Sequence, residues 1–245
     1  MTIAHRGYRK YALENTVSAF DKAILAGARG IECDIRLTSD NKVVVSHDNN
    51  IVIENRKVKI SNHSVSDLKK ICENSGHELL DLESLFEYVK QKQAEFFLEL
   101  KSTSPTLVES VIEKIKEKNL WEQVHVTGFS LFVKNALQAQ SQHSKLQVGQ
   151  FLHLPAYSYI KRPMKSYCVF LGWLDGIPGS QTLFKAFLSP ERLSKLKEFL
   201  EKNGFNVKGG VINNDSGLAL FREAGITDIV TDRVSETVKF FKQKS

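Results

Sequence analysis

Short apolar segments alternate with amphipathic ones along nearly the whole chain, and this alternation limits the fold more than any other feature. Eight segments have the length and apolar content of buried strands, and helical patterns separate most of them. The expected strands cover residues 2–6, 30–36, 95–101, 124–128, 146–152, 168–172, 207–213 and 228–231. The expected helices cover residues 64–73, 82–91, 105–118, 131–140, 190–203, 217–224 and 235–242, and a further helix opens near Asn15 as its N-cap.

This order of elements predicts an α/β fold, a TIM (β/α)8 barrel with a short extra hairpin strand after the second barrel strand. A doubly wound open sheet is the alternative, but neither a G-x-G-x-x-G nor a Walker A signature is present in the sequence. The chain shows no linker and no internal repeat, so residues 1–245 are expected to form one domain. In such a barrel the chemistry lies at the carboxyl ends of the strands.

The extra strand is expected at residues 43–47, directly after a turn-rich segment at residues 38–42. Only a few residues join it to the strand before, whereas a parallel crossover needs a dozen or more, so the two strands should pair antiparallel. A four-residue loop at residues 39–42 would set Asp34 opposite His47. A slip by one residue would turn His47 to the other face.

Two acidic residues stand two apart inside an otherwise apolar strand, the segment 30–36. Strand side chains alternate between faces, so Glu32 and Asp34 point to the same side. Neighbouring carboxylates repel each other and resist burial, so this pair needs compensation. A divalent cation with oxygen ligands would supply it, whereas a solvent-facing strand edge is the plainer explanation for an isolated pair.

The other expected strand ends also carry polar side chains of the kinds used in catalysis. His5 and Arg6 end the first strand, and Glu99 and Lys101 share one face at the end of the segment 95–101. With Glu32, Asp34 and His47 they bring three carboxylates, two histidines and two cations to one mouth. Such a set suits a phosphodiester, because a metal ion and two cations neutralise phosphoryl charge while two histidines exchange protons near neutral pH. The cation would be Mg²⁺ or Ca²⁺ on Glu32, Asp34 and Glu99.

Each of these residues alone has a structural explanation. His5 would serve as a core histidine bonded to a carbonyl group, and Glu99 with Lys101 would form a surface ion pair. Jointly these explanations fail, because they place several charges inside apolar strands without a purpose. The remaining histidines, His63, His77, His125, His143 and His153, are expected to be structural or on the surface. Trp173 follows a strand end and is expected to line the pocket.

Composition narrows the partners and the compartment. The formal net charge of +6 is mild and no run of Lys or Arg is present, which argues against a nucleic-acid partner. No segment has the length of a membrane span, so no stable membrane anchor is expected. Cys33, Cys72 and Cys168 are odd in number and far apart, as reduced thiols are. A cytoplasmic location follows as the default, and the sequence assigns no oligomeric state.

The order and spacing of these motifs resemble the glycerophosphodiester phosphodiesterase family over essentially the whole chain. The resemblance rests on five motifs of the first hundred residues, His5-Arg6-Gly7, Glu14-Asn15-Thr16, Gly30-Ile-Glu32-x-Asp34, His47-Asp48 and Glu99-Leu-Lys101. It continues in two later motifs, Gly128-Phe129-Ser130 and Ile229-Val-Thr-Asp232. These later segments are less specific than the first five.

The resemblance implies a metal-dependent hydrolysis of glycerophosphodiesters to sn-glycerol 3-phosphate and an alcohol. It implies His5 and His47 as the general acid and base, and Glu32, Asp34 and Glu99 as ligands of one divalent ion. Substrate contacts are expected from Arg6, Lys101, Phe129 and Asn213. Attack by the glycerol 2-hydroxyl through a cyclic phosphate and direct attack by water both remain open.

Two departures from the family pattern bear on the substrate. Gly210 stands where family members often carry an aromatic residue, which opens that wall, and Asn213 is kept. The segment after His47-Asp48 also differs, and the insertion that follows is short. A related phosphodiesterase of lysophospholipids or sphingolipids is therefore the close alternative. A non-catalytic barrel that binds phosphate-bearing ligands is a further one, although none of the motif residues is lost.

Overall fold

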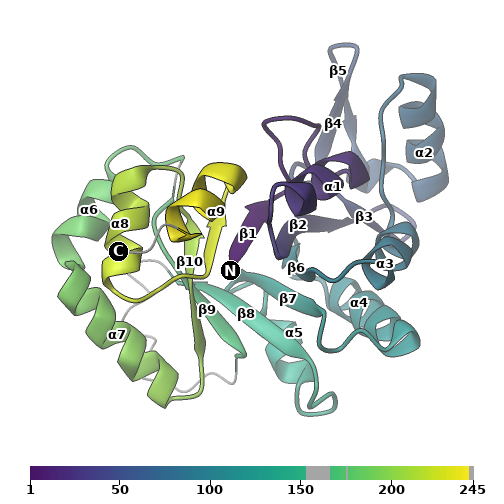
Figure 1. Cartoon of the computed structure of the whole chain (residues 1–245). Coiled ribbons are helices and arrows are strands. Elements are labelled where there is room, and N and C mark those ends of the chain that lie inside the picture. Colours follow the sequence, from purple (N-terminus) through teal and green to yellow (C-terminus); the bar gives the residue numbers. More distant parts are fainter. Residues whose placement is uncertain (153–165, 175, 243–245) are drawn as a thin grey trace.

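A closed barrel of parallel strands forms the centre of the computed structural model, which describes residues 1–152, 166–174 and 176–242 (Figure 1). Within the described residues the ring has eight strands, and it closes because β1 pairs with both β2 and β11. The strands of the ring are β1 (Thr2–His5), β2 (Gly30–Leu37), β6 (Glu95–Leu100), β7 (Val124–Phe129), β8 (Gln147–Leu152), β9 (Cys168–Leu171), β10 (Asn206–Val211) and β11 (Ile229–Thr231). The predicted barrel is confirmed.

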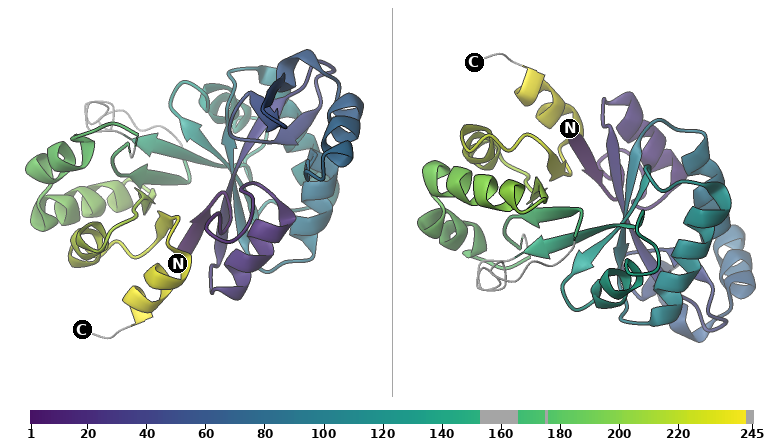
Figure 2. Two further views of the ribbon diagram at one scale, coloured as in Figure 1. Left: turned by 90° about the horizontal axis from the view of Figure 1, so that it is seen from above. Right: turned by 90° about the horizontal axis from the view of Figure 1, so that it is seen from below.

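Helices surround this ring when it is seen from above or below (Figure 2). They are α1 (Val17–Leu25), α2 (Val65–Asn74), α3 (Leu82–Lys90), α4 (Pro105–Lys118), α5 (Lys134–Ala139), α6 (Ser180–Phe187), α7 (Pro190–Lys202), α8 (Asp215–Glu223) and α9 (Val234–Lys242), with a short 3₁₀ turn η1 (Ile60–Asn62). Most of the expected helices lie where the periodicity placed them. The helix α6 was not predicted, and α5 starts later than expected.

The helix α4 shows how local sequence sets these boundaries. Pro105 occupies the first turn, where its missing N–H group costs no hydrogen bond. One face buries Leu107, Val111 and Ile115 against the sheet, at the spacing that a helix requires. Asn119 then takes a left-handed conformation with φ of 55° and ends the helix.

The antiparallel strand β3 (Val43–Val45) lies beside β2 outside the ring, as expected, but its register differs from the prediction. Ile35 pairs with Val45, so Asp34 stands opposite Ser46, whose N–H group bonds to the Asp34 carbonyl. The prediction that Asp34 faces His47 was wrong by one residue. The loop has three residues rather than four, because Asn41 adopts φ of 58° and lets Lys42 pair with Thr38.

The segment after His47 contains a second hairpin that was not predicted, β4 (Asn50–Ile53) and β5 (Arg56–Lys59). Its two-residue turn consists of Glu54 and Asn55, both with positive φ. Such a turn matches the twist of the flanking strands, but it lacks the Asn-Gly signature by which it is usually recognised. In Figure 1 this hairpin projects above the barrel.

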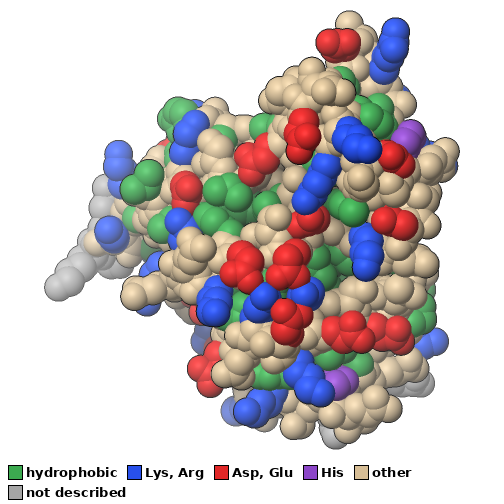
Figure 3. All heavy atoms as spheres, turned by 90° about the vertical axis from the view of Figure 1, so that its right-hand side faces the viewer, with side chains coloured by type: hydrophobic (Ala, Val, Ile, Leu, Met, Phe, Trp, Pro, Cys, Tyr) green, Lys and Arg blue, Asp and Glu red, His purple; other side chains and the backbone are tan. Residues whose placement is uncertain are grey.

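Charges on the outer helices are mostly neutralised by neighbours of opposite sign. Lys118 of α4 lies 2.6 Å from Glu87 and 3.0 Å from Glu83 of α3, and Lys114 also pairs with Glu83. Figure 3 shows acidic and basic side chains intermingled on this side of the molecule. A mixed surface of this kind provides no broad basic field on the face shown.

The barrel interior is filled in layers, as expected for this fold. A middle layer is apolar and contains Ile3, Phe97, Phe170 and Val230. Phe97 and Phe170 meet edge to face, with ring centroids 5.8 Å apart. This layer separates polar side chains at the carboxyl ends of the strands from other polar side chains at their amino ends. Among the helices of the described residues, none combines the length and the apolar character needed to cross a membrane.

Candidate active site

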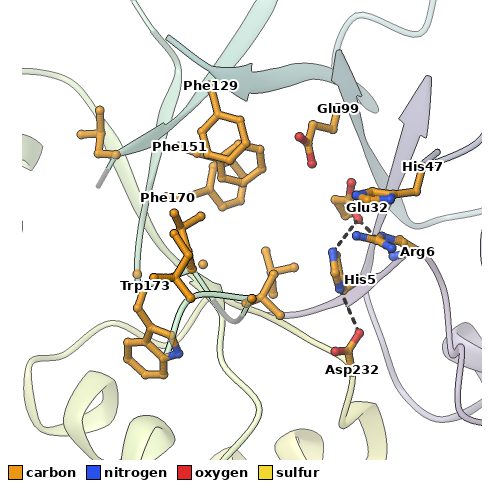
Figure 4. A pocket seen from close by; sticks show the side chains of 18 of the residues that line it. His5, Arg6, Glu32, His47, Glu99, Phe129, Phe151, Phe170, Trp173 and Asp232 are labelled. Atoms are coloured by element: carbon orange, nitrogen blue, oxygen red, sulfur yellow. Dashed lines mark hydrogen bonds and ion pairs between the residues drawn. The ribbon is translucent and has the colours of Figure 1, made fainter. Parts of the chain in front are cut away.

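A pocket of about 510 Å³ opens at the carboxyl ends of the barrel strands (Figure 4). One side of it is polar and contains His5, Arg6, Arg9, Glu32, His47, Glu99, Lys101 and Asp232. The opposite side is apolar and includes Phe129, Phe151, Phe170, Trp173 and Ile177. Figure 4 shows the aromatic rings facing the charged side chains across the cavity. The predicted gathering of charged strand ends at one mouth is confirmed.

Three carboxylates form the centre of the polar side. Glu32 and Asp34 project from the same face of β2, and Glu99 stands beside Asp34 on the neighbouring strand β6. All three are buried, and one oxygen of each lies within 4.8 Å of the others. The alternation of β2 explains this arrangement, since Ile31, Cys33 and Ile35 point outward into the helix layer.

Two cations compensate this negative charge only in part. The Lys101 ammonium lies 2.9 Å from Asp34 and 2.6 Å from Glu99. The Arg6 guanidinium lies 3.2 Å from Asp34 through Nε and 3.1 Å from Glu14 through Nη1. Arg6 has φ of 57°, and this turn lets its backbone N–H group donate to Glu32 at 3.0 Å.

The three carboxylates respond differently to this environment. Burial, together with repulsion from Asp34 and Glu99, raises the pKa of Glu32 well above its ordinary value. Burial also raises the pKa of Glu99, against the opposing effect of Lys101. Burial opposes ionisation of Asp34 too, but Lys101 and Arg6 outweigh it and hold the pKa of that carboxyl below its ordinary value. The cluster therefore lacks positive charge around Glu32.

A divalent cation would fit this cluster. Glu32 Oε1 is buried and has no hydrogen-bond partner among the described residues. Buried carboxylate oxygens are ordinarily paired, so an oxygen left without a partner indicates a missing ligand. The donor set consists of carboxylate oxygens, which suit Mg²⁺ or Ca²⁺ better than softer metals.

His5 lies beside the acidic cluster and is held from its other side by Asp232. Its Nδ1 is 2.9 Å from Asp232 Oδ1, and its Nε2 is 3.9 Å from Glu32 Oε2 (Figure 4). Asp232 follows β11 and also contacts Arg9 at 2.8 Å. Asn213 donates to the second oxygen of Asp232 at 2.7 Å. His5 is thus oriented with Nε2 toward the pocket.

His47 approaches the cluster from the segment after β3. Arg36 donates its Nε–H group to the His47 carbonyl at 2.8 Å, which anchors this segment to β2. The imidazole Nδ1 lies 2.9 Å from Asp48 Oδ1. Burial lowers the pKa of His47, with Arg6 and Lys101 acting in the same direction against the pull of Asp34. His47 therefore lines the pocket although it does not stand opposite Asp34 in the hairpin.

Phe129 and Asn213 were both expected to contact substrate. Phe129 lines the apolar side, and its ring centroid lies 5.4 Å from that of Phe151. Asn213 is not among the described residues of the pocket wall and instead holds Asp232 through its amide. Its direct contact with substrate stays a prediction.

Asn15 is a site residue that the periodicity did not reveal. The prediction that Asn15 caps α1 was wrong, because Thr16 is the N-cap and accepts a hydrogen bond from Ala19. Asn15 has φ of 60° and turns inward, where its amide donates to Asp34 at 2.9 Å and accepts from the Asp34 N–H group at 3.2 Å. An Asn before a capping Thr was the available signal, since Asn tolerates left-handed φ.

The expectation that Gly210 opens the apolar side is not supported, because a side chain there would lie 3.4 Å from the Leu171 carbonyl oxygen and 3.5 Å from Gly172 Cα. A β-bulge at Gly210 interrupts the pairing of β10 with β11, so Gly210 and Val211 both line the pocket. A side chain at Gly172 would meet the Gly210 backbone at 3.2 Å, which shows how closely β9 and β10 approach here. Trp173 lines the pocket as expected and packs against Phe184, with ring centroids 5.5 Å apart.

Comparisons with known proteins agree with this site. Residues 5–236 match the sequence profile of the glycerophosphoryl diester phosphodiesterase family. A glycerophosphodiester phosphodiesterase of Caldanaerobacter subterraneus subsp. tengcongensis is 26% identical over 243 residues, which cover 95% of this chain and 93% of the relative. The crystal structure of a Thermotoga maritima glycerophosphodiester phosphodiesterase has a TM-score of 0.76 at 26% identity, over 97% of this chain and 96% of that chain.

A third similar structure contains a bound product. The phosphodiesterase of Oleispira antarctica, solved in complex with the product sn-glycerol-3-phosphate, has a TM-score of 0.77 at 19% identity. The match covers 99% of this chain and 97% of that chain. At this identity the likeness supports the barrel fold of the described residues.

Proposed function

Because the chain belongs to the glycerophosphoryl diester phosphodiesterase family, we propose that it hydrolyses glycerophosphodiesters to sn-glycerol 3-phosphate and an alcohol. The observation that carries this proposal is the pocket in which two histidines, two cations and three buried carboxylates meet. The product named for the Oleispira antarctica structure supports the same substrate class.

Arg6 and Lys101 would bind the phosphate. Arg6 provides a planar fork that suits two phosphoryl oxygens, and Lys101 provides a point charge. Burial opposes the charge of both cations, but Asp34 together with Glu14 at Arg6 and Glu99 at Lys101 outweighs burial and raises the pKa of both, so both stay charged throughout the neutral range. Their charge stabilises the negative charge that develops on the phosphoryl oxygens in the transition state.

His5 and His47 would serve as the general acid and base. One removes a proton from the attacking hydroxyl group, and the other protonates the departing alkoxide oxygen. Both imidazoles line the same pocket, and each has Nδ1 engaged by a neighbouring aspartate. This engagement leaves each Nε2 free to exchange a proton with substrate.

Glu32, Asp34 and Glu99 would hold one divalent ion, Mg²⁺ or Ca²⁺. When bound there, the ion supplies positive charge close to the phosphoryl oxygens. The repulsion that raises the pKa of Glu32 would be relieved in the same step, because a cation favours the ionised carboxylate.

The test is release of glycerol 3-phosphate from glycerophosphocholine and glycerophosphoethanolamine. We expect release with Mg²⁺ or Ca²⁺ and none with a chelator. His5→Gln and His47→Gln should each lose about 10²- to 10⁴-fold in kcat. His143→Gln is the matched control, because His143 stacks on Trp121 away from the pocket. Metal-independent release, or full activity in both variants, would contradict the proposal.

A lysophospholipid is the second candidate substrate, and the apolar side of the pocket favours it. Phe129, Phe151 and Ile177 offer an acyl-bearing alcohol an apolar surface that choline alone would leave exposed. Parallel assays with lysophosphatidylcholine distinguish the two. A kcat/KM at least tenfold above that for glycerophosphocholine would establish the lipid substrate. A ratio below one would exclude it.

The compartment and the domain organisation are also part of the proposal. Cys33, Cys72 and Cys168 are buried and unpaired, which fits a reducing cytoplasm. We infer one domain for residues 1–245, since the matched family profile spans residues 5–236. Fractionation of cells that express the native chain tests the location, and limited proteolysis tests the domain.

A further inference from the structure

We propose that Asp232 is a positioning residue that holds the His5 imidazole in one tautomer and one orientation, with Asn213 and Arg9 fixing Asp232 in turn. This inference rests on the proposed role of His5 in proton transfer. It assigns a function to a carboxylate outside the acidic cluster of Glu32, Asp34 and Glu99.

The first argument is the direction of the hydrogen bond. Asp232 Oδ1 lies 2.9 Å from His5 Nδ1. Hydrogen bonds from His5 and Asn213, together with the charge of Arg9, outweigh burial and keep the pKa of Asp232 below its ordinary value. An ionised carboxylate only accepts hydrogen bonds, so Nδ1 must carry the proton. The lone pair of Nε2 then faces the pocket.

The second argument is that Asp232 is itself immobilised. Asn213 contacts Asp232 twice through its side-chain amide. The amide nitrogen donates to Asp232 Oδ2 at 2.7 Å, and the amide oxygen Oδ1 accepts from the Asp232 backbone N–H group at 2.8 Å. Arg9 Nε lies 2.8 Å from Oδ1. Both carboxylate oxygens are therefore occupied, and the carboxylate cannot rotate away from His5 without losing several contacts.

The third argument is the contrast with His47. Its Nδ1 also lies 2.9 Å from an aspartate, but the Asp48 side chain is 76% exposed, whereas that of Asp232 is 16% exposed. No further side chain holds the Asp48 carboxylate among the described residues. A contact to an exposed carboxylate orients a ring weakly, because water competes for it. Of the two imidazoles, only His5 contacts an aspartate that other side chains hold in place.

The experiment compares Asp232→Asn with the wild type in the metal-loaded enzyme. We expect kcat to fall about 10²- to 10⁴-fold, while KM changes less than threefold, because the amide can donate to Nδ1 and favour the wrong tautomer. Asp232→Glu should recover part of the lost kcat. Asp48→Asn should lower kcat less than fivefold. Asp215→Asn, which removes an exposed partner of Arg233, is the control for unchanged activity.

Nitrogen-15 NMR of the histidine rings provides the readout that a purely structural role would not move. In the wild type the His5 signals, assigned by their loss in His5→Gln, should report a protonated Nδ1. In Asp232→Asn they should shift to protonated Nε2 or to a mixture. Unchanged His5 signals with wild-type kcat would overturn the inference, even if the melting temperature fell.

Two further outcomes separate this inference from the proposed function. If His5→Gln keeps full activity, the role of His5 fails, and the inference fails with it. If His5→Gln is inactive while Asp232→Asn is fully active, only the positioning role fails. Should Asp232→Asn not fold, Asn213→Ser releases the carboxylate without removing it. That variant should lower kcat about 10-fold and broaden the His5 signals, and wild-type behaviour of both would reject the inference.

Discussion

The barrel contains two groups of charged side chains, one buried and one partly buried, that resemble each other in composition and differ in pairing. The mouth cluster consists of Glu32, Asp34, Glu99, Arg6 and Lys101 at the carboxyl ends of the strands. The floor cluster consists of Glu95, His125, Lys208 and Asp228 at the amino ends. The apolar layer around Phe97 and Phe170 separates them.

In the floor cluster each acidic group has its own basic partner. Lys208 lies 2.8 Å from Asp228, and His125 Nε2 lies 3.0 Å from Glu95. The close contact with His125 lowers the pKa of Glu95 against the effect of burial. Burial opposes ionisation of Asp228, but Lys208 and the N-terminal ammonium of Met1 together outweigh it and lower the pKa of Asp228. The fold therefore favours the ionised form of both carboxylates more than water does.

In the mouth cluster, burial outweighs the attraction of the cations at two of the three carboxylates. The pKa values of Glu32 and Glu99 are raised by burial, and one Glu32 oxygen has no partner among the described residues. Charge that the fold leaves uncompensated indicates a site prepared for a ligand, whereas paired charge indicates a structural role. This contrast distinguishes the two ends of the barrel without reference to conservation.

The largest expected effect comes from removing the uncompensated charge. Glu32→Gln keeps the shape and the acceptor for the Arg6 N–H group, but it removes a ligand and its charge. We expect kcat/KM to fall about a thousandfold. The metal-free protein should be as stable as the wild type or more stable, because a buried charge without a full partner is removed. Loss of activity with a lowered melting temperature would mean that Glu32 serves the fold instead.

Metal binding should stabilise the wild type and not Glu32→Gln. A ligand at 100 times its Kd adds about 2.7 kcal/mol to the free energy of unfolding. We therefore expect thermal melting of the wild type to rise on titration with Mg²⁺ or Ca²⁺ and to return on chelation. An equal rise in Glu32→Gln would place the binding elsewhere in the molecule.

Most of the mouth cluster could be predicted because each member lies in a barrel strand or directly after one. Strand alternation fixes the face of Glu32 and Asp34, and parallel pairing brings Glu99 beside Asp34. Arg6 and Lys101 follow from the same rule, since both come at or directly after a strand end. These positions depend on period and order alone, which a sequence carries directly.

Other parts depend on single backbone conformations that periodicity does not encode. Asn41 with positive φ shortens the hairpin loop by one residue and shifts the register of β3. Asn15 with positive φ turns its amide to Asp34 instead of capping α1. The floor cluster was also missed, because Glu95 and Lys208 begin or interrupt strands and gain their partners only when distant strands meet. Closure of the barrel determines which of these residues become partners.

Breaking a floor pair should destabilise the protein and leave catalysis unchanged. Asp228→Asn leaves the Lys208 ammonium buried without its counterion. We expect the free energy of unfolding to fall by about 2 kcal/mol, less than for a fully buried pair because Asp228 is one-third exposed. Denaturant titration measures this loss. kcat per folded molecule should equal the wild-type value, and a fall in kcat would show that the two clusters are coupled.

The pH dependence of these two variants should differ in sign and in range. A raised folded-state pKa means that ionised Glu32 destabilises the metal-free fold at neutral pH, so Glu32→Gln is then the more stable protein. This advantage should vanish as pH falls through the raised pKa toward the unfolded value of about 4.3.

The lowered pKa of Asp228 has the opposite consequence. Its ionised form stabilises the fold fully above the unfolded value of about 3.9, and this contribution is lost as pH falls further. The deficit of Asp228→Asn should therefore persist to lower pH than the advantage of Glu32→Gln. Melting temperatures of the wild type, Glu32→Gln and Asp228→Asn, all measured with a chelator across the acidic range, test this. If both variants lost their difference from the wild type at the same pH, the assigned pKa shifts would be refuted.

The smallest expected effect isolates one polar contact of the floor cluster. The His125 ring stacks on Phe97 at 4.5 Å and on Tyr167 at 5.2 Å, so His125→Phe keeps the stacking and removes only the contact with Glu95. We expect the free energy of unfolding to fall by about 1 kcal/mol, since Glu95 is partly exposed and water replaces its partner. Burial lowers the pKa of His125, which keeps the ring neutral at pH 7 and limits the contribution of its charge. A loss well above that of Asp228→Asn would mean that the His125–Glu95 contact is an ion pair with a charged imidazole.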